Sequence, residues 1–332
     1  MPMKYGPSSA MPAATTRMPA FRFLRRVAAL ACALPLAGCG TVLLNASGDV
    51  ARQQGDLIVH STLLMLLIIV PVLALIGIVA WRYRQSNRAA TYTPEWDHST
   101  QLELVIWMVP LLIIIALGAI TWISTHTLDP YRPIERIDQN RPVASGVKPL
   151  VVEVVALDWK WLFIYPEQGI ASVNELAAPV DRPIRFDITA SSVMNSFYIP
   201  ALAGQVYAMP GMQTQLHAVI NKAGTYEGFS ANYSGAGFSH MRFAFRGVDE
   251  AGFEQWVAQA RTHAAPLDRP TYLQLEKPSE NAPVAFYGTL DAGLFDAILN
   301  RCVAPGTTCI NDMMMHDMHA NDGAAHHHHA SE

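Results

Sequence analysis

Two long apolar runs dominate the first part of the chain. Leu57 to Trp81 contains no Asp, Glu, Lys or Arg, and Leu104 to Ser124 is a second run of the same kind. About 20 apolar residues span a bilayer as a helix. We therefore expect transmembrane helices at about 57–83 and 102–125, in a hairpin over residues 39–130. A buried soluble helix is the alternative for either run, but two such runs favour the membrane.

The pattern changes after Pro149 to short runs broken by Pro, Gly and Asn. The runs predict strands at Leu150–Ala156, Trp161–Tyr165, Ile184–Thr189, Gln213–Ile220, Thr225–Ser230 and Met241–Arg246. Several short strands with turns between them predict an antiparallel sandwich or barrel over residues 149–250. Residues 251–300 follow as a helix, Phe253 to Ala264, and an arm that ends in a short helix, Ala292 to Asn300.

Trp159 and Trp161 lie two residues apart, so they share one face if this segment is extended. An aromatic pair of this kind is typical of a core. A role in docking a partner or in electron transfer is the alternative.

Charge and spacing at the N-terminus predict a lipoprotein signal peptide over residues 1–38. Four arginines precede a short apolar run, Val27 to Leu36, which is too short to span a bilayer. The run ends in Leu-Ala-Gly-Cys39, which resembles a bacterial lipobox, so we expect Cys39 to be lipidated. An ordinary signal peptide is the alternative. Either way the mature chain faces an oxidising compartment.

The connection between the two apolar runs carries Arg82, Arg84 and Arg88, whereas Asp56 and Asp129 flank the outer ends. Positive charge marks the cytoplasmic side of a membrane protein. The hairpin should therefore turn in the cytoplasm, with the large domain outside, in agreement with the lipobox.

The remaining composition narrows the function. The formal net charge is −4, and no basic cluster beyond the N-terminus would follow a phosphate backbone, so nucleic acid is not an expected partner. Cys302 and Cys309 could form a disulfide or remain as free thiols. Residues 301–332 read as a disordered tail. Its Met- and His-rich part, Met313 to His329, should have incidental affinity for copper or zinc without a defined role.

Two segments look like a pair of metal-binding loops whose ligands have been replaced. They are Ser191–Pro200 and Tyr226–Met241. A mixed-valence copper site needs thiolates and imidazoles on neighbouring loops. The second loop keeps the glycines, but it carries Ser230, Asn232 and Ser234, which are poor copper ligands.

Long segments of the chain resemble subunit II of the haem-copper respiratory oxidases, and within that family the cytochrome bo-type ubiquinol oxidases. The segments are LDWKWLFIYPEQGIASVNELA, SSVMNSFYIPALAGQVYAMPGM and TYEGFSANYSGAGFSHM, and YLQLEKPSENAPVAFYGTLDAGLFDAIL resembles the family's C-terminal arm. The resemblance extends from about Cys39 to Asn300. It implies a two-helix transmembrane hairpin and an all-β, cupredoxin-like periplasmic domain, a Greek-key sandwich or barrel.

The resemblance also locates the altered copper site. In the cytochrome c oxidases this domain holds a binuclear copper centre. Asn195 stands here at the position of its first histidine, and Phe238 at that of its second histidine. Ser230 and Ser234 stand at the positions of its two bridging cysteines. Asn232 occupies the position of the family's glutamate, which ligates through its carbonyl. Met241 alone is retained, and His240 is out of register, so we expect no metal at this site and a packing role for Met241.

The family implies a subunit of a proton-pumping quinol oxidase, which turns quinol and oxygen into quinone and water in the bacterial inner membrane. Haems, copper and the catalytic centres would lie in subunit I, the principal partner, and subunits III and IV would be further partners. Ubiquinol reaches its site from the lipid, so the copper relay used by a soluble electron donor becomes unnecessary. This chain would serve in assembly and shielding. Glu103 matches a family acid at the mouth of a proton pathway, whereas the residue alone is equally consistent with an interfacial carboxylate.

Two other functions remain to be distinguished. A membrane-tethered copper-handling cupredoxin would use Met241, His240 and the tail. A cytochrome c oxidase subunit II is disfavoured by the missing ligands.

Overall fold

The computed structural model describes residues 42–315, except residues 92 and 264. The predicted signal peptide, Cys39 and the chain beyond Met315 lie outside the described residues.

Two helices form the hairpin, α2 (Asp49–Arg82) and α3 (Thr100–Thr127). Both are long and apolar enough to cross a membrane. They run through Pro71 and Pro110 without a break in the helix assignment, as membrane helices can when other groups satisfy the freed carbonyls. Helix α2 begins at Asp49 rather than near residue 57, because its first turns are polar and pack on the outer domain instead of on lipid.

The contacts at the start of α2 explain this earlier beginning. The amide groups of Ser47 and Gly48 donate to the carbonyl of Ala201, at 3.1 and 2.8 Å, and Ala51 is fully buried. A β-carbon at Gly48 would lie 2.6 Å from the carbonyl oxygen of Leu202, so only glycine allows this approach.

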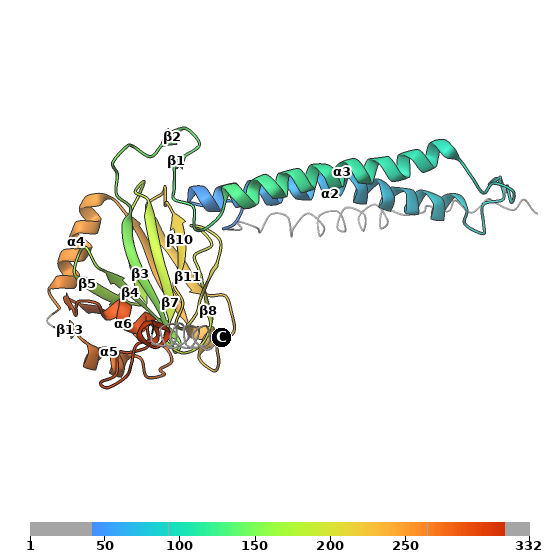
Figure 1. The fold of residues 1–332 in the computed structure, drawn as a ribbon. Coiled ribbons are helices and arrows are strands. Elements are labelled where there is room, and N and C mark those ends of the chain that lie inside the picture. Colours follow the sequence, from blue (N-terminus) through green and yellow to red (C-terminus); the bar gives the residue numbers. More distant parts are fainter. Residues whose placement is uncertain (1–41, 92, 264, 316–332) are drawn as a thin grey trace, which may run out of the picture. The chain divides into compact units, whose positions relative to one another are not determined.

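Two sheets make up the outer domain (Figure 1). The six-stranded sheet has the order β10 (Thr214–Ala218), β7 (Ile184–Ala190), β3 (Leu150–Leu157), β4 (Lys160–Tyr165), β5 (Ile170–Val173) and β14 (Ala285–Tyr287). The five-stranded sheet has the order β6 (Glu175–Pro179), β12 (Arg242–Val248), β11 (Gly224–Ser230), β8 (Asn195–Tyr198) and β9 (Val206–Ala208). Short pairs join β1 (Arg136–Asp138) to β2 (Arg141–Pro142) and β13 (Pro266–Leu267) to β15 (Thr289–Leu290).

The strand pattern predicted an antiparallel sandwich, but two of the strand pairs are parallel. Strands β3 and β7 pair in parallel, as do β6 and β12. The chain makes a meander of β3, β4 and β5, crosses to the other sheet at β6, and returns at β7 beside β3. Because the chain passes through the other sheet before it returns, β7 runs parallel to β3.

The alternating side chains of β3 face two separate cores. Val152 and Val154 point between the sheets, whereas Val155 and Leu157 point to the opposite face. Burial on both faces explains why this strand is an almost continuous apolar run.

The C-terminal arm covers that opposite face. Helix α4 (Glu250–Arg261) precedes the arm and packs instead against the core of Val152 and Val154. It begins one turn earlier than predicted, because the carboxylate of Asp249 caps it by accepting from the amide of Gly252. Helices α5 (Arg269–Leu275) and α6 (Leu294–Leu299) follow. The buried amino group of Lys160 donates to the carbonyl of Lys277 and to the hydroxyl of Ser279, both at 2.7 Å, and so ties the arm to β4.

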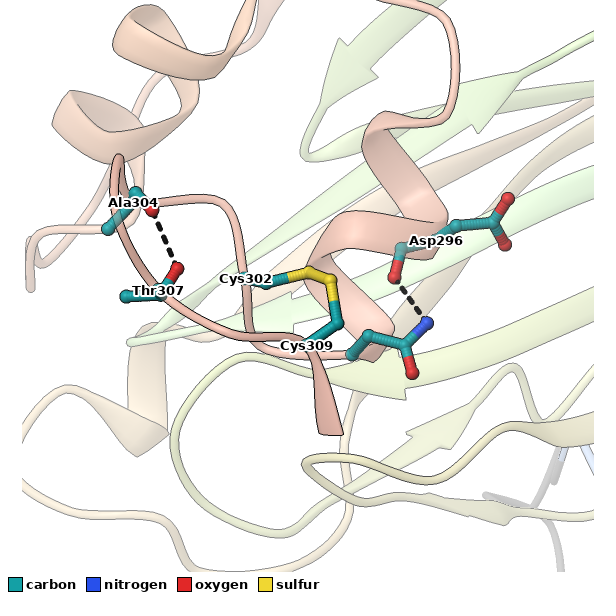
Figure 2. Close-up of a disulfide and its surroundings, with 6 residues drawn as sticks. Asp296, Cys302, Ala304, Thr307 and Cys309 are labelled. Carbon is teal, nitrogen blue, oxygen red and sulfur yellow. Dashed lines mark hydrogen bonds between the residues drawn. A yellow bond between two sulfur atoms is a disulfide. The ribbon is translucent and has the colours of Figure 1, made fainter. Parts of the chain in front are cut away.

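The first part of the predicted disordered tail is ordered instead. A disulfide joins Cys302 to Cys309 directly after α6, as Figure 2 shows. Cys302 and Val303 are buried in the same core as α6, and a helical segment occupies 310–315. Burial of these apolar groups outweighs the low-complexity composition that suggested disorder.

The segment between the two tryptophans is not extended, so the alternation of a strand does not relate their side chains. Trp159 lies in a turn with a φ of 65°, after β3 ends at Leu157. Trp161 is fully buried and packs against Phe197 and Phe243. Trp159 is partly buried and packs against the same core, so both tryptophans contact it, as predicted for the pair.

Candidate functional site

The two loops that the sequence paired do meet in the structure. Strand β11 lies antiparallel to β8, with Ser230 opposite Phe197. The amide of Ala231 donates to the carbonyl of Ser196 at 3.0 Å, and the amide of Ser230 donates to the carbonyl of Met241 at 3.1 Å. These backbone bonds place Asn195, Ser230 and Met241 at one end of the five-stranded sheet.

At the centre of the site a hydrogen bond joins two of the altered positions. The hydroxyl of Ser230 donates to Oδ1 of Asn195 at 3.0 Å, and it also lies 3.2 Å from the carbonyl oxygen of Asn232. The amide group of Asn195 donates in turn to the carbonyl of Val193 at 3.1 Å. Asn195 and Ser230 are almost completely buried, so these bonds satisfy groups that water cannot reach.

Ser234 and Phe238 contact residues other than Asn195 and Ser230. The carbonyl of Ser234 accepts from Nε1 of Trp159 at 3.1 Å, and the ring of Phe238 packs edge-on against Tyr233 with 5.7 Å between ring centroids. Met241 is buried in the core, as its sequence context predicted.

Sequence reasoning missed the part that Trp159 plays in shaping the loop. Its indole lies against Gly235, which has a φ of 118°, and against Gly237. A β-carbon at Gly237 would come within 2.6 Å of the indole, so the glycine is required by this close approach. The Gly-x-Gly spacing was the available signal.

The donor set does not suit a binuclear copper centre. Two thiolates bridge such a centre and imidazoles complete it, but this cluster offers two amides, two hydroxyls, a phenyl ring and one thioether. The hydroxyl of Ser230 and the carbonyl of Asn232 already bond to each other. His240 is exposed, and its Nδ1 lies 3.5 Å from the hydroxyl of Ser239. Within residues 42–315 no group of three or more His, Cys, Asp or Glu side chains could hold a metal ion.

Glu103 lies in the first turn of α3, at the connection between the two helices. Its carboxylate is 2.7 Å from Nδ1 of His98, and the other ring nitrogen of His98 is 3.1 Å from the hydroxyl of Thr100. About half of the Glu103 side chain is exposed. The sequence singled out Glu103 but not His98, whose place five residues earlier in a loop carries no periodic signal.

Comparisons with known proteins agree on one family. The periplasmic domain of cytochrome c oxidase subunit II matches residues 167–248, and the aromatic-rich motif of these oxidases matches residues 261–306. Cytochrome bo(3) ubiquinol oxidase subunit 2 of Pseudomonas putida is 50% identical over 268 residues, which cover 81% of this chain and 82% of that protein. Ubiquinol oxidase subunit 2 of Acetobacter aceti is 49% identical, over 83% of this chain and 87% of that protein.

Among solved structures, the periplasmic domain of cytochrome oxidase subunit II of Bradyrhizobium japonicum is 26% identical. The match covers 34% of this chain and 94% of that one, with a TM-score of 0.33.

Proposed function

The chain belongs to the ubiquinol oxidase subunit 2 family, and from this membership we propose that it is the subunit II of a proton-pumping quinol oxidase and holds no redox centre of its own. The reaction would be the oxidation of quinol to quinone with reduction of oxygen to water. Haems, copper and the catalytic steps would reside in subunit I, and subunits III and IV would complete the complex.

One observation carries the proposal: Asn195 and Ser230, which stand at two of the copper-ligand positions, are buried and bond to each other. The bond from Ser230 to Asn195 satisfies these two side chains without a metal, whereas the hydroxyl of Ser234 is buried with no hydrogen-bond partner among the described residues. A ubiquinol donor dissolves in the lipid, so no relay is required in the outer domain. The preserved sandwich would then serve assembly and shielding.

A comparison of electron donors tests this function. We would extract the complex from membranes, measure oxygen uptake with ubiquinol and with reduced cytochrome c, and determine copper by elemental analysis. Ubiquinol-driven uptake with a single copper in the whole complex is the expected result. Uptake driven by cytochrome c, with additional copper, would show that the outer domain does hold a relay. A chain purified with copper but without a haem partner would support the copper-handling cupredoxin instead.

We further propose that Glu103 lies at the mouth of a proton pathway into subunit I. Its carboxylate lies beside the imidazole of His98 and is half exposed, so the pair can take a proton from water and pass it inward. Glu103→Gln should lower quinol-driven turnover and proton pumping severalfold, and Glu103→Asp should restore much of both.

Glu95 provides the matched control for this variant, because it is an exposed carboxylate in the same connection. Glu95→Gln should leave turnover and pumping unchanged. Normal pumping in Glu103→Gln would leave Glu103 with a structural role only.

The remaining proposals concern location. We place the chain in the bacterial inner membrane, with the outer domain in the periplasm and a palmitate-bearing anchor at Cys39. The argument rests on the lipobox and the arginine-rich connection. Mass spectrometry of the mature N-terminal peptide tests the anchor. An unmodified Cys39 would refute it, and Cys39→Ser should abolish the added mass.

A further inference from the structure

A cavity of about 290 Å³ lies where the start of α2 and the end of α3 meet the sandwich. It is lined by the first turns of α2, by the segment from Thr127 to Arg136, and by side chains of the sandwich such as Leu216 and His217. Both helices are long enough to cross a membrane, so the cavity lies at the level of lipid headgroups on the side of the outer domain.

Charges of both signs line this cavity. Asp49 is buried and accepts from Arg136 at 2.9 Å, so this pair is already satisfied. Arg132 donates to Glu135 at 2.8 Å, and the side chains are 43% and 73% exposed. An exposed ion pair contributes little free energy, so both of its members can exchange partners for a ligand.

The balance of charge selects the kind of ligand. Three carboxylates, those of Asp49, Asp129 and Glu135, face the two guanidinium groups of Arg132 and Arg136. Burial and the nearby Arg185 lower the pKa of His217 and so disfavour a positive charge on its ring, against the opposing effect of Asp187. A ligand that carries a phosphate together with a positive group complements this lining, whereas a purely anionic headgroup does not.

An apolar groove on α3 leads toward the cavity. Its lining includes Ile114, Gly118, Thr121 and Thr125, which recur every three or four residues and therefore share one face of the helix. The next position on that face is Leu128, which lines the cavity. A polar cavity that continues into an apolar groove fits an amphiphile with a long chain.

We propose that this cavity and groove bind one zwitterionic phospholipid of the outer leaflet. Its phosphate accepts from Arg132, its ammonium group donates to Glu135 and Asp129, and one acyl chain lies along the α3 groove. The site is separate from the altered copper loops and from Glu103. Its test does not depend on which electron donor the complex uses.

The glycines of the hairpin provide matched variants. A β-carbon at Gly118 or at Gly77 would meet nothing within 4 Å, so a leucine at either position disturbs no internal packing. Gly118 lines the groove and Gly77, on α2, does not. Gly118→Leu should fill the groove, Gly77→Leu should leave it open, and Arg132→Gln should remove the phosphate donor without entering the membrane.

Native mass spectrometry of the delipidated complex measures binding, with phosphatidylethanolamine and phosphatidylglycerol of matched chains added separately. We expect one phosphatidylethanolamine per wild-type and Gly77→Leu complex, and weaker binding of phosphatidylglycerol. Arg132→Gln should bind about tenfold more weakly, as expected for loss of one charge-assisted hydrogen bond. Gly118→Leu should also lose the lipid. If Gly118→Leu fails to assemble, Arg132→Gln decides alone.

Three results would overturn the proposal. Equal binding of the two lipids, unaffected by Arg132→Gln, would show only a general lipid annulus. A quinol recovered in place of phospholipid would refute the headgroup assignment. Binding of neither lipid would show that a partner subunit closes the cavity.

Discussion

Glu153 lies on β3 with like charges on two sides. Asp187 stands beside it in the parallel register of β3 and β7, and Asp296 on α6 adds a second negative charge. Burial, followed by these two carboxylates, raises the pKa of Glu153 to about 7, and Arg185 opposes the shift only in part. The unfolded chain ionises this group near 4.5.

We predict that Glu153→Gln stabilises the protein above pH 7. Between about pH 4.5 and pH 7 the folded state keeps a proton that the unfolded state has lost, so stability falls as the pH rises through this window. The variant removes this loss, which we expect to be about 2 kcal/mol after allowance for partial exposure. Thermal unfolding of the detergent-purified chain should show a higher midpoint for the variant at pH 8 and little difference at pH 4.5.

The exposed carboxylate of Glu227, paired with Arg242 at 2.6 Å, serves as the control for this measurement. Glu227→Gln should change the midpoint little at either pH. A Glu153→Gln variant that behaves in the same way would mean that Glu153 ionises as it does in water.

The C-terminal arm is the element whose stability depends on a covalent bond. The disulfide between Cys302 and Cys309 closes a short loop at the end of α6 (Figure 2). Loop closure of this size stabilises by about 2.5 kcal/mol through the unfolded state. The double variant Cys302→Ser/Cys309→Ser should therefore speed hydrogen exchange in α6 and residues 301–315. Exchange in β3 and β7 should stay slow, and equal acceleration there would show that the arm and the sandwich unfold together.

The elements that the sequence predicted well are those with a strong local pattern. Both membrane helices were predicted because a long apolar run without charges is typical of a membrane-spanning helix. The strands of the sandwich were predicted from β-branched runs between turns. The parallel pairing of β3 with β7 depends on contacts far apart in the chain, so no local pattern could show it. The sequence did not predict the turn at Trp159. A tryptophan rarely adopts a φ of 65°, and here tertiary contacts with the glycine loop hold it in this conformation.

For the candidate site, residue types could be predicted but their bonds could not. The sequence alone shows that Ser230 and Ser234 cannot provide thiolates, because this follows from the residue type and not from the fold. The bond from Ser230 to Asn195 required the fold, which brings together residues of β8 and β11 that are far apart in sequence. His98 beside Glu103 is a similar case, since only the loop geometry shows that the two side chains meet.

At the scale of the whole molecule, the start of α2 is held to the outer domain by one ion pair beside the backbone bonds. Asp49 is almost completely buried, and both of its oxygens accept from Arg136, at 2.9 and 3.3 Å. Arg136→Gln would leave a buried carboxylate with only Gln53 as a side-chain partner among the described residues. We expect a loss of about 2 kcal/mol, less than for a fully buried pair because Arg136 is partly exposed.

Hydrogen exchange at the first turns of α2 measures this effect in the assembled complex. Arg136→Gln should speed exchange there, whereas Glu227→Gln, which breaks only the exposed pair with Arg242, should not. Asp49→Asn in the Arg136→Gln background should slow the exchange again, since an amide no longer carries an uncompensated charge. If Arg136→Gln exchanges like the wild type, the backbone bonds from Ser47 and Gly48 to Ala201 are sufficient to hold the hairpin to the sandwich.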